Sequence, residues 1–440
     1  MPREATDGGS ALGTLMILVG IVAALLVTAI GDDEAGPAGS GPANTTGNEE
    51  SELSLSDLAV KLQPQTARKV EIIRRLQFRK IPEPRVVNSE FLNELTRREL
   101  RKPRVAADAV ASSIEAKLLG LIEFDDDLTA VATESGDLAA AAYDPRSGRL
   151  YVLSDSVGAE PALIEFVLAH ELNHALEDQR FGLEDSSVAA DDRALAQTSL
   201  VEGTATALMT DYATKFLNPL ELGASAAGLD PGTEGVPEFV VEQLEFAYLE
   251  GSKFVQALYA RTDSWLLVNR ALRSDPPSST EQILHPVKYL LGEEPMPVSL
   301  GQGLLGKGWV PVDTGAAGEF ATTQILEVGD ANVEARTAAE GWGGDRYVLL
   351  RRRSTPPGDC VESPVCRSHY AIVVAWRWDS ARDTEEFTAA LPAYLEGGLN
   401  ADRVTGGWEL TDGAAAVSVD GGEVRLALAP TLALARRAAG

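Results

Sequence analysis

The pattern of apolar and polar positions predicts a mainly helical first half of the chain. Apolar residues spaced three and four apart predict helices over 65–79, 89–99 and 106–121. Segments 137–143 and 149–154 flank the turn sequence Asp-Pro-Arg-Ser-Gly and predict a β-hairpin. A longer helix is expected directly after it, over about 161–179. The hairpin therefore leads straight into a helix.

Further helices are expected downstream. A second long helix begins near Asp191, and a helical stretch covers 239–262. Ser279 and Gln282 form a capping box for a short helix that ends at His285, just before a proline. The alternation of the second long helix runs through Leu195, Leu200, Ala205 and Leu208.

From about residue 311 the pattern changes to short strands. Their order with the helices, ββαββα, predicts a small α+β layer packed on the first part, so the fold class is α+β. Residues 342–345 are expected to form a turn, and no catalytic group of residues is visible in this layer. The expected elements are strands over 345–351 and 369–376, a helix over 380–395, a strand over 407–410, a hairpin over 414–428 and a last helix over 430–439.

The amino-terminal region contains an uncharged apolar run, 11–30, long enough as a helix to span a bilayer core of about 30 Å. Arg3 precedes it and no basic residue follows before Lys61, so the positive-inside rule places the bulk of the chain outside the cytoplasm. We expect a single-pass membrane anchor. A cleavable signal, leaving a secreted protein, is the alternative, since Val27-Thr-Ala29 offers a small-residue cleavage site.

Composition narrows the classes of partner. The net charge of −28 and the pI near 4.5 argue against binding to nucleic acid and to anionic lipid surfaces. The chain has two cysteines, Cys360 and Cys366. An even pair outside the cytoplasm is most simply a disulfide, expected here to pin a hairpin loop.

The strongest chemical motif is His170-Glu171-Leu-Asn-His174, which uses two of only four histidines in 440 residues. Positions four apart share one helix face, so His170 and His174 can present two imidazole nitrogens to one ion. Tetrahedral zinc accepts such ligands. Glu171 lies beside them and can act as general base on a water held by the metal.

A third ligand is expected on the second long helix. Glu202 falls on the small, apolar side of that helix, where an unpaired carboxylate would be costly to bury. A metal ion would remove that cost. The sequence thus predicts a zinc site with His170, His174 and Glu202, with a fourth position open to water.

These residues resemble a known group of enzymes. The runs from His170 to Phe181 and from Leu200 to Thr206, with the distal 279–289 segment Ser-Thr-Glu-Gln-Ile-Leu-His-Pro-Val-Lys-Tyr, are similar to a largely uncharacterised family of secreted or membrane-anchored metallopeptidases of the thermolysin-like, gluzincin type. The resemblance covers about 55–440. It implies a zincin-like catalytic domain with the ligands and base just named, and a peptide substrate added as a strand to the edge of its sheet.

Two neighbours of the ligands are candidates for a supporting role. Thermolysin-like enzymes carry an aspartate four residues after the ligand glutamate, where this chain has Thr206, which can accept an imidazole N–H but adds no charge. Asp178, one turn after His174, could fix the helix junction, orient a histidine, or lie on a solvated face.

His285 and Tyr289 complete the set of candidates. Either could turn into the cleft and donate a hydrogen bond to the oxyanion that develops on the attacked carbonyl. The alternative for His285 is a local structural role, satisfying backbone carbonyls at the end of its helix.

The sequence as a whole predicts an extracytoplasmic zinc peptidase. The expected parts are a cytoplasmic stub (1–10), the anchor or signal (11–30), a disordered linker (31–54), a zincin-like domain (55–305) and the α+β layer (306–440). A membrane-tethered binding or scaffold protein on a degenerate zincin fold is the alternative, and hydrolysis of a non-peptide amide is a weaker one. Retention of Glu171 favours an enzyme, because a scaffold needs no base beside the metal.

Overall fold

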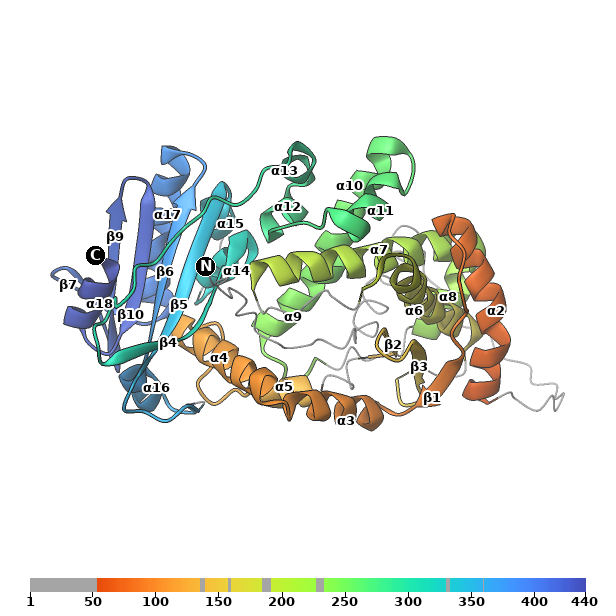
Figure 1. The fold of residues 1–440 in the computed structure, drawn as a ribbon, viewed down its shortest axis with the longest axis horizontal. Helices are drawn as coiled ribbons and strands as arrows, with labels where there is room; N and C mark the ends of the chain where they lie inside the picture. Colours follow the sequence, from red (N-terminus) through yellow and green to blue (C-terminus); the bar gives the residue numbers. More distant parts are fainter. Residues whose placement is uncertain are drawn as a thin grey trace, which may run out of the picture.

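The computed structural model describes residues 54–134, 139–156, 160–183, 191–226, 233–329, 333–358 and 360–440. It confirms the α+β class: a helical part with a small sheet lies beside a layer built on a larger sheet (Figure 1). The apolar run 11–30 and its linker lie outside the described residues. Within the described ranges, no helix is long and apolar enough to cross a membrane.

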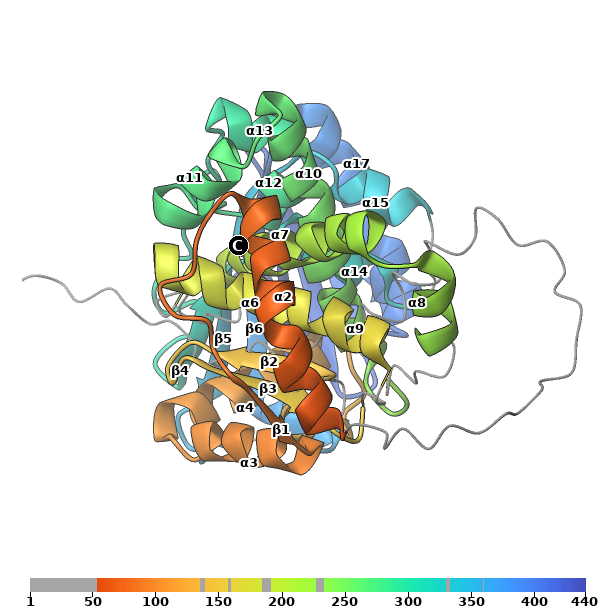
Figure 2. The same ribbon diagram turned by 90° about the vertical axis from the view of Figure 1, so that its right-hand side faces the viewer.

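Three long helices form the centre of the helical part. They are α2 (Leu55–Arg74), α6 (Pro161–Phe181) and α7 (Asp192–Phe216), and they share one apolar core. Figure 2 shows α2 lying across α6. The bounds of the helix expected over 65–79 were wrong, because Ser54 caps α2 so that it begins at Leu55, and Arg75 ends it in the left-handed conformation.

A run of shorter helices follows α7. The helical stretch expected over 239–262 is confirmed, but it contains a π turn, η2, between its two α-helical segments. The cap by Ser279 is confirmed, since its hydroxyl accepts the backbone N–H of Gln282, but the Gln282 side chain accepts from the backbone N–H of Ser278 and not of Ser279. The run comprises α8 (Pro219–Ala226), α9 (Glu238–Glu245), η2 (Phe246–Glu250), α10 (Gly251–Thr262), α11 (Leu266–Ser274), α12 (Thr280–Leu284) and α13 (Pro286–Leu291).

The small sheet has three strands in the order β1-β3-β2. The predicted hairpin is confirmed as β2 (Ala141–Asp144) antiparallel to β3 (Arg149–Leu153), and β1 (Pro84–Val87) lies parallel to β3. One face packs into the core around α6, and the other face packs on α3 (Ser89–Leu100). Strand β2 is therefore an edge strand next to the motif helix.

The C-terminal layer is a seven-stranded sheet in the order β4-β5-β6-β10-β9-β8-β7. The expected strands, the hairpin and both helices are confirmed, whereas β4, β7, α14, α15 and α16 were not anticipated. The elements are β4 (Trp309–Gly315), α14 (Gly318–Glu327), α15 (Val333–Ala339), β5 (Trp342–Arg352), α16 (Ser363–His369), β6 (Tyr370–Trp378), α17 (Ala381–Ala393), η3 (Tyr394–Gly398), β7 (Asp402–Val404), β8 (Gly407–Leu410), β9 (Gly413–Asp420), β10 (Glu423–Ala429) and α18 (Leu432–Ala439).

The turn expected over 342–345 was wrong. These residues begin β5, where the register with β6 shifts between Trp342 and Gly344. A side chain at Gly344 would overlap the backbone of Met296, so glycine lets the connecting chain cross the strand closely.

The helical part and the C-terminal layer do not divide cleanly along the sequence. Helix α4 (Pro103–Leu119) precedes the metal motif in sequence, yet Ile114 and Leu118 pack into the core of the C-terminal layer. The division expected at 305/306 therefore does not separate the two cores. The short helix α5 (Leu128–Thr133) follows α4 in the chain.

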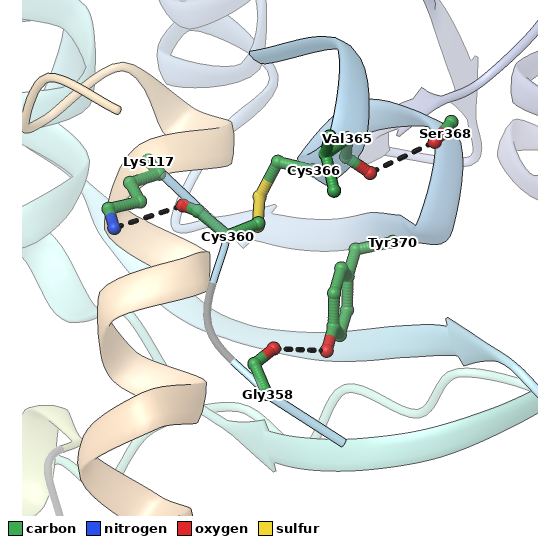
Figure 3. The surroundings of a disulfide bond; sticks show 7 residues. All are labelled: Lys117, Gly358, Cys360, Val365, Cys366, Ser368 and Tyr370. Carbon is green, nitrogen blue, oxygen red and sulfur yellow. Dashed lines mark hydrogen bonds between the residues drawn. A yellow bond between two sulfur atoms is a disulfide. The ribbon is translucent and has the colours of Figure 1, made fainter. Parts of the chain in front are cut away.

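The disulfide between Cys360 and Cys366 is present, in the connection between the paired strands β5 and β6 (Figure 3). The buried ammonium of Lys117, on α4, donates to the carbonyl of Cys360 at 3.1 Å. The disulfide loop thus also fastens α4 to the layer.

Candidate metal centre

Helix α6 presents the motif residues on one face. His170, Glu171 and His174 lie near its middle, 0–1% exposed, and the two Nε2 atoms are 2.9 Å apart. Pro161 starts the helix and Gly182 ends it in a left-handed conformation, so the motif lies about two turns from either end. Helical spacing alone accounts for this pair.

Helix α7 brings Glu202 to the same point. Its Oε2 atom lies 3.2 Å from Nε2 of His170 and 3.4 Å from Nε2 of His174, and the residue is 4% exposed. The contact expected from the sequence is therefore present, since α6 and α7 bring a carboxylate and two imidazoles together.

The donor set fits a tetrahedral metal ion. Bonds of about 2.0–2.1 Å to zinc hold neighbouring ligand atoms about 3.3 Å apart. The three donor atoms here are separated by 2.9, 3.2 and 3.4 Å. Two neutral imidazoles and one carboxylate are also ligand types that zinc accepts. Three protein ligands leave one position of the tetrahedron for water or substrate.

Charge at the centre points the same way. Burial lowers the pKa of His170 to about 4. Burial also opposes protonation of His174, but the Glu202 carboxylate outweighs it and raises that pKa to about 9. Burial opposes ionisation of Glu202, yet the charge of His174 and hydrogen bonds from both histidines hold its pKa below the usual range. The negative charge of Glu202 and a positive charge on His174 thus stabilise each other.

A second acidic group does not offer a comparable site. Glu281, Glu293 and Asp379 are the other three acids among the described residues that lie close enough to hold an ion. The ammonium of Lys288 already lies among them, 2.7 Å from Glu281 and 2.9 Å from Glu293. This cluster is an ion-pair network.

Glu171 points toward the edge strand of the small sheet. The backbone N–H of Tyr143, on β2, donates to its carboxyl group, while its Oε2 atom has no hydrogen-bond partner. Burial raises the pKa of Glu171 to about 8, although His174 opposes this shift. A buried carboxyl group with a free oxygen beside the donor set is suited to accept and release a proton.

Tyr248 is a residue of the centre that the sequence analysis missed. Its ring stacks on the ring of His170, with centroids 5.9 Å apart, and its buried hydroxyl lies close to the Glu202 carboxylate. Burial raises its pKa well above the usual value, so the phenol is a neutral donor. The only sequence signal was a tyrosine in a helix, which has no distinctive spacing from the motif.

Two glycines allow Tyr248 to approach. Gly203 on α7 and Gly251 at the start of α10 cross so closely that a side chain on either would overlap the other helix's backbone. Glu202 precedes the first glycine directly, and the second follows Tyr248 by one turn. Tyr248 lies in the middle of the π turn η2, which directs its ring toward His170. Such π turns are often found at functional sites.

A buried polar network around Glu177 connects α6 to both α2 and α7. Glu177 on α6 pairs with Arg74 on α2 at 3.0 Å, and both side chains are fully buried. The hydroxyl of Thr204 on α7 donates to the same carboxylate at 2.8 Å. Because Thr204 is two residues from Glu202, this network holds the ligand carboxylate opposite the histidines.

The expected hydrogen bond to Thr206 is not made. Its Oγ1 atom is buried without a hydrogen-bond partner, as are Nδ1 of His170 and Nδ1 of His174. Asp178 acts at the helix junction: it accepts the hydroxyl of Tyr143 at 2.8 Å and the backbone N–H of Leu183 at 3.1 Å. Asp178 thus fastens the end of α6 to β2 and contacts no histidine.

His285 and Tyr289 have partners other than the donor set. Nε2 of His285 lies 2.9 Å from Glu319, and the hydroxyl of Tyr289 donates to the carbonyl of Asp275 at 2.8 Å. Neither side chain makes a hydrogen bond or ring contact with the metal centre. The partner of His285 is thus a carboxylate of α14, neither the backbone carbonyls at the end of its own helix nor the donor set.

Comparison with known protein families finds a match for the C-terminal layer but not for the helical part that carries the donor residues. A family model described as a domain of unknown function (DUF8575) matches residues 310–439, which include none of the donor residues. No curated protein matches the chain. A crystal structure of a proposed hydrolase with a novel fold from Chloroflexus aurantiacus is similar over 62% of this chain and 96% of that chain, with 14% sequence identity and a TM-score of 0.38.

Proposed function

We propose that this protein is a zinc-dependent hydrolase that cleaves peptide bonds. The observation that supports it is the convergence of His170, His174 and Glu202 within 3.4 Å, with a carboxyl group, Glu171, beside them. When bound, zinc would polarise the substrate carbonyl and lower the pKa of a water molecule.

The remaining chemistry is assigned to side chains. Glu171 takes a proton from the attacking water and delivers it to the leaving amine nitrogen. Tyr248, a neutral donor whose ring stacks on His170, donates a hydrogen bond to the oxyanion that develops on the carbonyl. This replaces His285 and Tyr289, whose hydrogen bonds lie elsewhere.

The substrate is proposed to bind as an extended peptide. Strand β2 is an edge strand and its Tyr143 contacts the base directly. An extended segment added to such an edge would gain main-chain hydrogen bonds without a requirement for particular side chains. Its scissile carbonyl would then lie near Glu171.

A test compares zinc content and cleavage of a peptide library by the wild type and by Glu171→Gln. We expect stoichiometric zinc in both, with cleavage reduced roughly 10²–10⁴-fold in the variant. Glu165→Gln is the matched control, since Glu165 is a buried glutamate of the same helix that instead accepts from Lys69. Bound zinc without cleavage by the wild type would favour the scaffold function.

We also propose that the catalytic part lies outside the cytoplasm, held by residues 11–30. The disulfide supports an oxidising compartment. Intact mass of the native protein and its resistance to alkaline extraction from membranes distinguish a retained anchor from a cleaved signal. Recovery in the cytoplasmic fraction would contradict both.

A further inference from the structure

We infer that helix α14 of the C-terminal layer is a positioning element of the metal centre. Its residue Phe320 holds the π turn in place, so that Tyr248 keeps its position against the ring of His170 and close to Glu202. The inference rests on the proposed function and assigns a task to the start of the region matched as a domain of unknown function. It is carried by contacts on both sides of the π turn.

The outer side of the π turn contacts α14. Phe246 stacks on Phe320 with ring centroids 4.2 Å apart, and Phe246 is almost fully buried. Four residues further along α14, the amide of Gln324 donates to Glu242 of α9 at 2.7 Å. The segment that leads into the π turn is therefore held by the C-terminal layer at two points.

The inner side of the π turn contacts the metal centre. Side chains two positions apart in a helical turn leave on roughly opposite sides, because each residue adds about 80–100° of rotation. Phe246 and Tyr248 are such a pair. The π turn thus packs between Phe320 on one side and His170 on the other.

Helix α14 is itself tied to the ligand helix α7. The carboxylate of Asp192, in the first turn of α7, accepts the backbone N–H of Thr280 at 2.8 Å and also its hydroxyl. The same hydroxyl accepts the backbone N–H of Phe320 at 3.2 Å. A side chain at Gly318 would overlap the carboxylate of Asp192, so the start of α14 lies directly against the start of α7.

The arrangement in the fold agrees with these contacts. Figure 1 shows α14 between the large sheet and the N-terminal end of α7, next to α9. The other side of α14 packs into the sheet core through Ile325. Movement of the layer relative to the helical part would therefore reach Tyr248 through Phe320.

The test is a double-mutant cycle on zinc affinity, with zinc alone as the probe in competition with a chromophoric chelator. Tyr248→Phe removes the hydroxyl from Glu202 and should weaken zinc binding about tenfold, the lower end for a partner of a metal ligand. Phe320→Ala should weaken it by roughly three- to tenfold, and the double variant should be no weaker than Tyr248→Phe. Phe320→Leu, which keeps an apolar side chain against Phe246, should restore most of the affinity.

Ile325→Ala is the matched control. It removes a buried apolar side chain from the same helix, on the side away from the π turn, so it should lower thermal stability but leave zinc affinity within twofold. The visible spectrum of the cobalt-substituted protein gives a second readout. It should change alike in Tyr248→Phe and Phe320→Ala, and not in Ile325→Ala.

The outcomes separate the two proposals. A folded wild type that binds no zinc overturns the proposed function. Zinc binding by the wild type, with additive effects of the Phe320 and Tyr248 substitutions or with equal losses in Phe320→Ala and Ile325→Ala, overturns the positioning role alone.

Discussion

The molecule buries acidic side chains in both of its parts, at the metal centre and at the start of α14. In the C-terminal layer, Asp345 accepts the backbone N–H groups of Ala317 and Gly318, both at 2.8 Å, and the indole N–H of Trp342 at 3.0 Å. At the metal centre, Oε2 of Glu171 and Nδ1 of each histidine have no hydrogen-bond partner.

This difference distinguishes Asp345, whose carboxylate is fully used in the structure, from Glu171, to which we assign the transfer of a proton. Folding favours complete hydrogen bonding of buried polar groups, since each unpaired group costs roughly 1–3 kcal/mol. Asp345 obeys this rule and fixes a turn. The centre of α6 and α7 departs from it, which is expected where a site is built to receive an ion and move a proton.

The largest expected effect is at the third ligand. Glu202→Gln keeps the shape of the side chain but removes the charge that balances the ion, so zinc affinity should fall by more than the 10–100-fold typical of an outer partner. Metal analysis after dialysis measures this. Glu171→Gln is the control, because it removes the neighbouring carboxyl group and should retain zinc; equal zinc loss in the two variants would refute the assigned roles.

The next largest expected effect is at the buried ion pair between Arg74 of α2 and Glu177 of α6. Arg74→Met leaves the Glu177 carboxylate buried and unpaired, which should lower the free energy of unfolding by about 3–5 kcal/mol. Urea denaturation measures the loss. Combining it with Glu177→Gln should recover part of the stability, and strictly additive losses would show that the two charges do not interact.

The crossing of α7 and α10 should tolerate no added side chain. Gly203→Ala places a methyl group against the backbone of Gly251 and should cost about 1–3 kcal/mol, together with loss of zinc affinity as Tyr248 moves. Gly223→Ala in α8 is the matched control: nothing lies within 4 Å of the added atom, so it should be neutral or stabilising by roughly 0.4–1 kcal/mol. Equal melting temperatures of the two variants would contradict a close crossing.

The smallest expected effect is a pH dependence at the junction of the two parts. The hydrogen bond to Glu319 raises the pKa of His285, with burial opposing it. A raised folded-state pKa stabilises the fold fully below about pH 6.5, and this contribution is lost as the pH rises through the folded value. Since His285 is one-third exposed, a few tenths of a kcal/mol is expected.

The check is unfolding in urea between pH 5 and 8.5. His285→Gln should remove this part of the slope, and Glu319→Gln should remove the same part. If the slope of the wild type persists in both variants, another group is responsible.

Local patterns in the sequence determined much of the molecule. The i, i+4 spacing of His170 and His174 needs only a helix, and the apolar periodicity around them predicted that helix to within two residues at its C-terminal end. The position of Glu202 on a small, apolar face sufficed to assign it inward. The hairpin and most strands of the C-terminal layer also follow from alternation and turn residues. The disulfide followed from the even number of cysteines and the expected compartment.

Tertiary structure alone decided which distant residues complete the site. Tyr248 reaches the histidines because two glycines let α7 and α10 cross and a π turn re-aims one residue, and neither event leaves a periodic signal. His285 and Tyr289 were candidates for the site, but His285 pairs with Glu319 of α14 and Tyr289 with the carbonyl of Asp275. Helix α14, which was not anticipated, holds the π turn. A period along the chain reports which face of an element is buried, whereas the partner across that face depends on how whole elements pack.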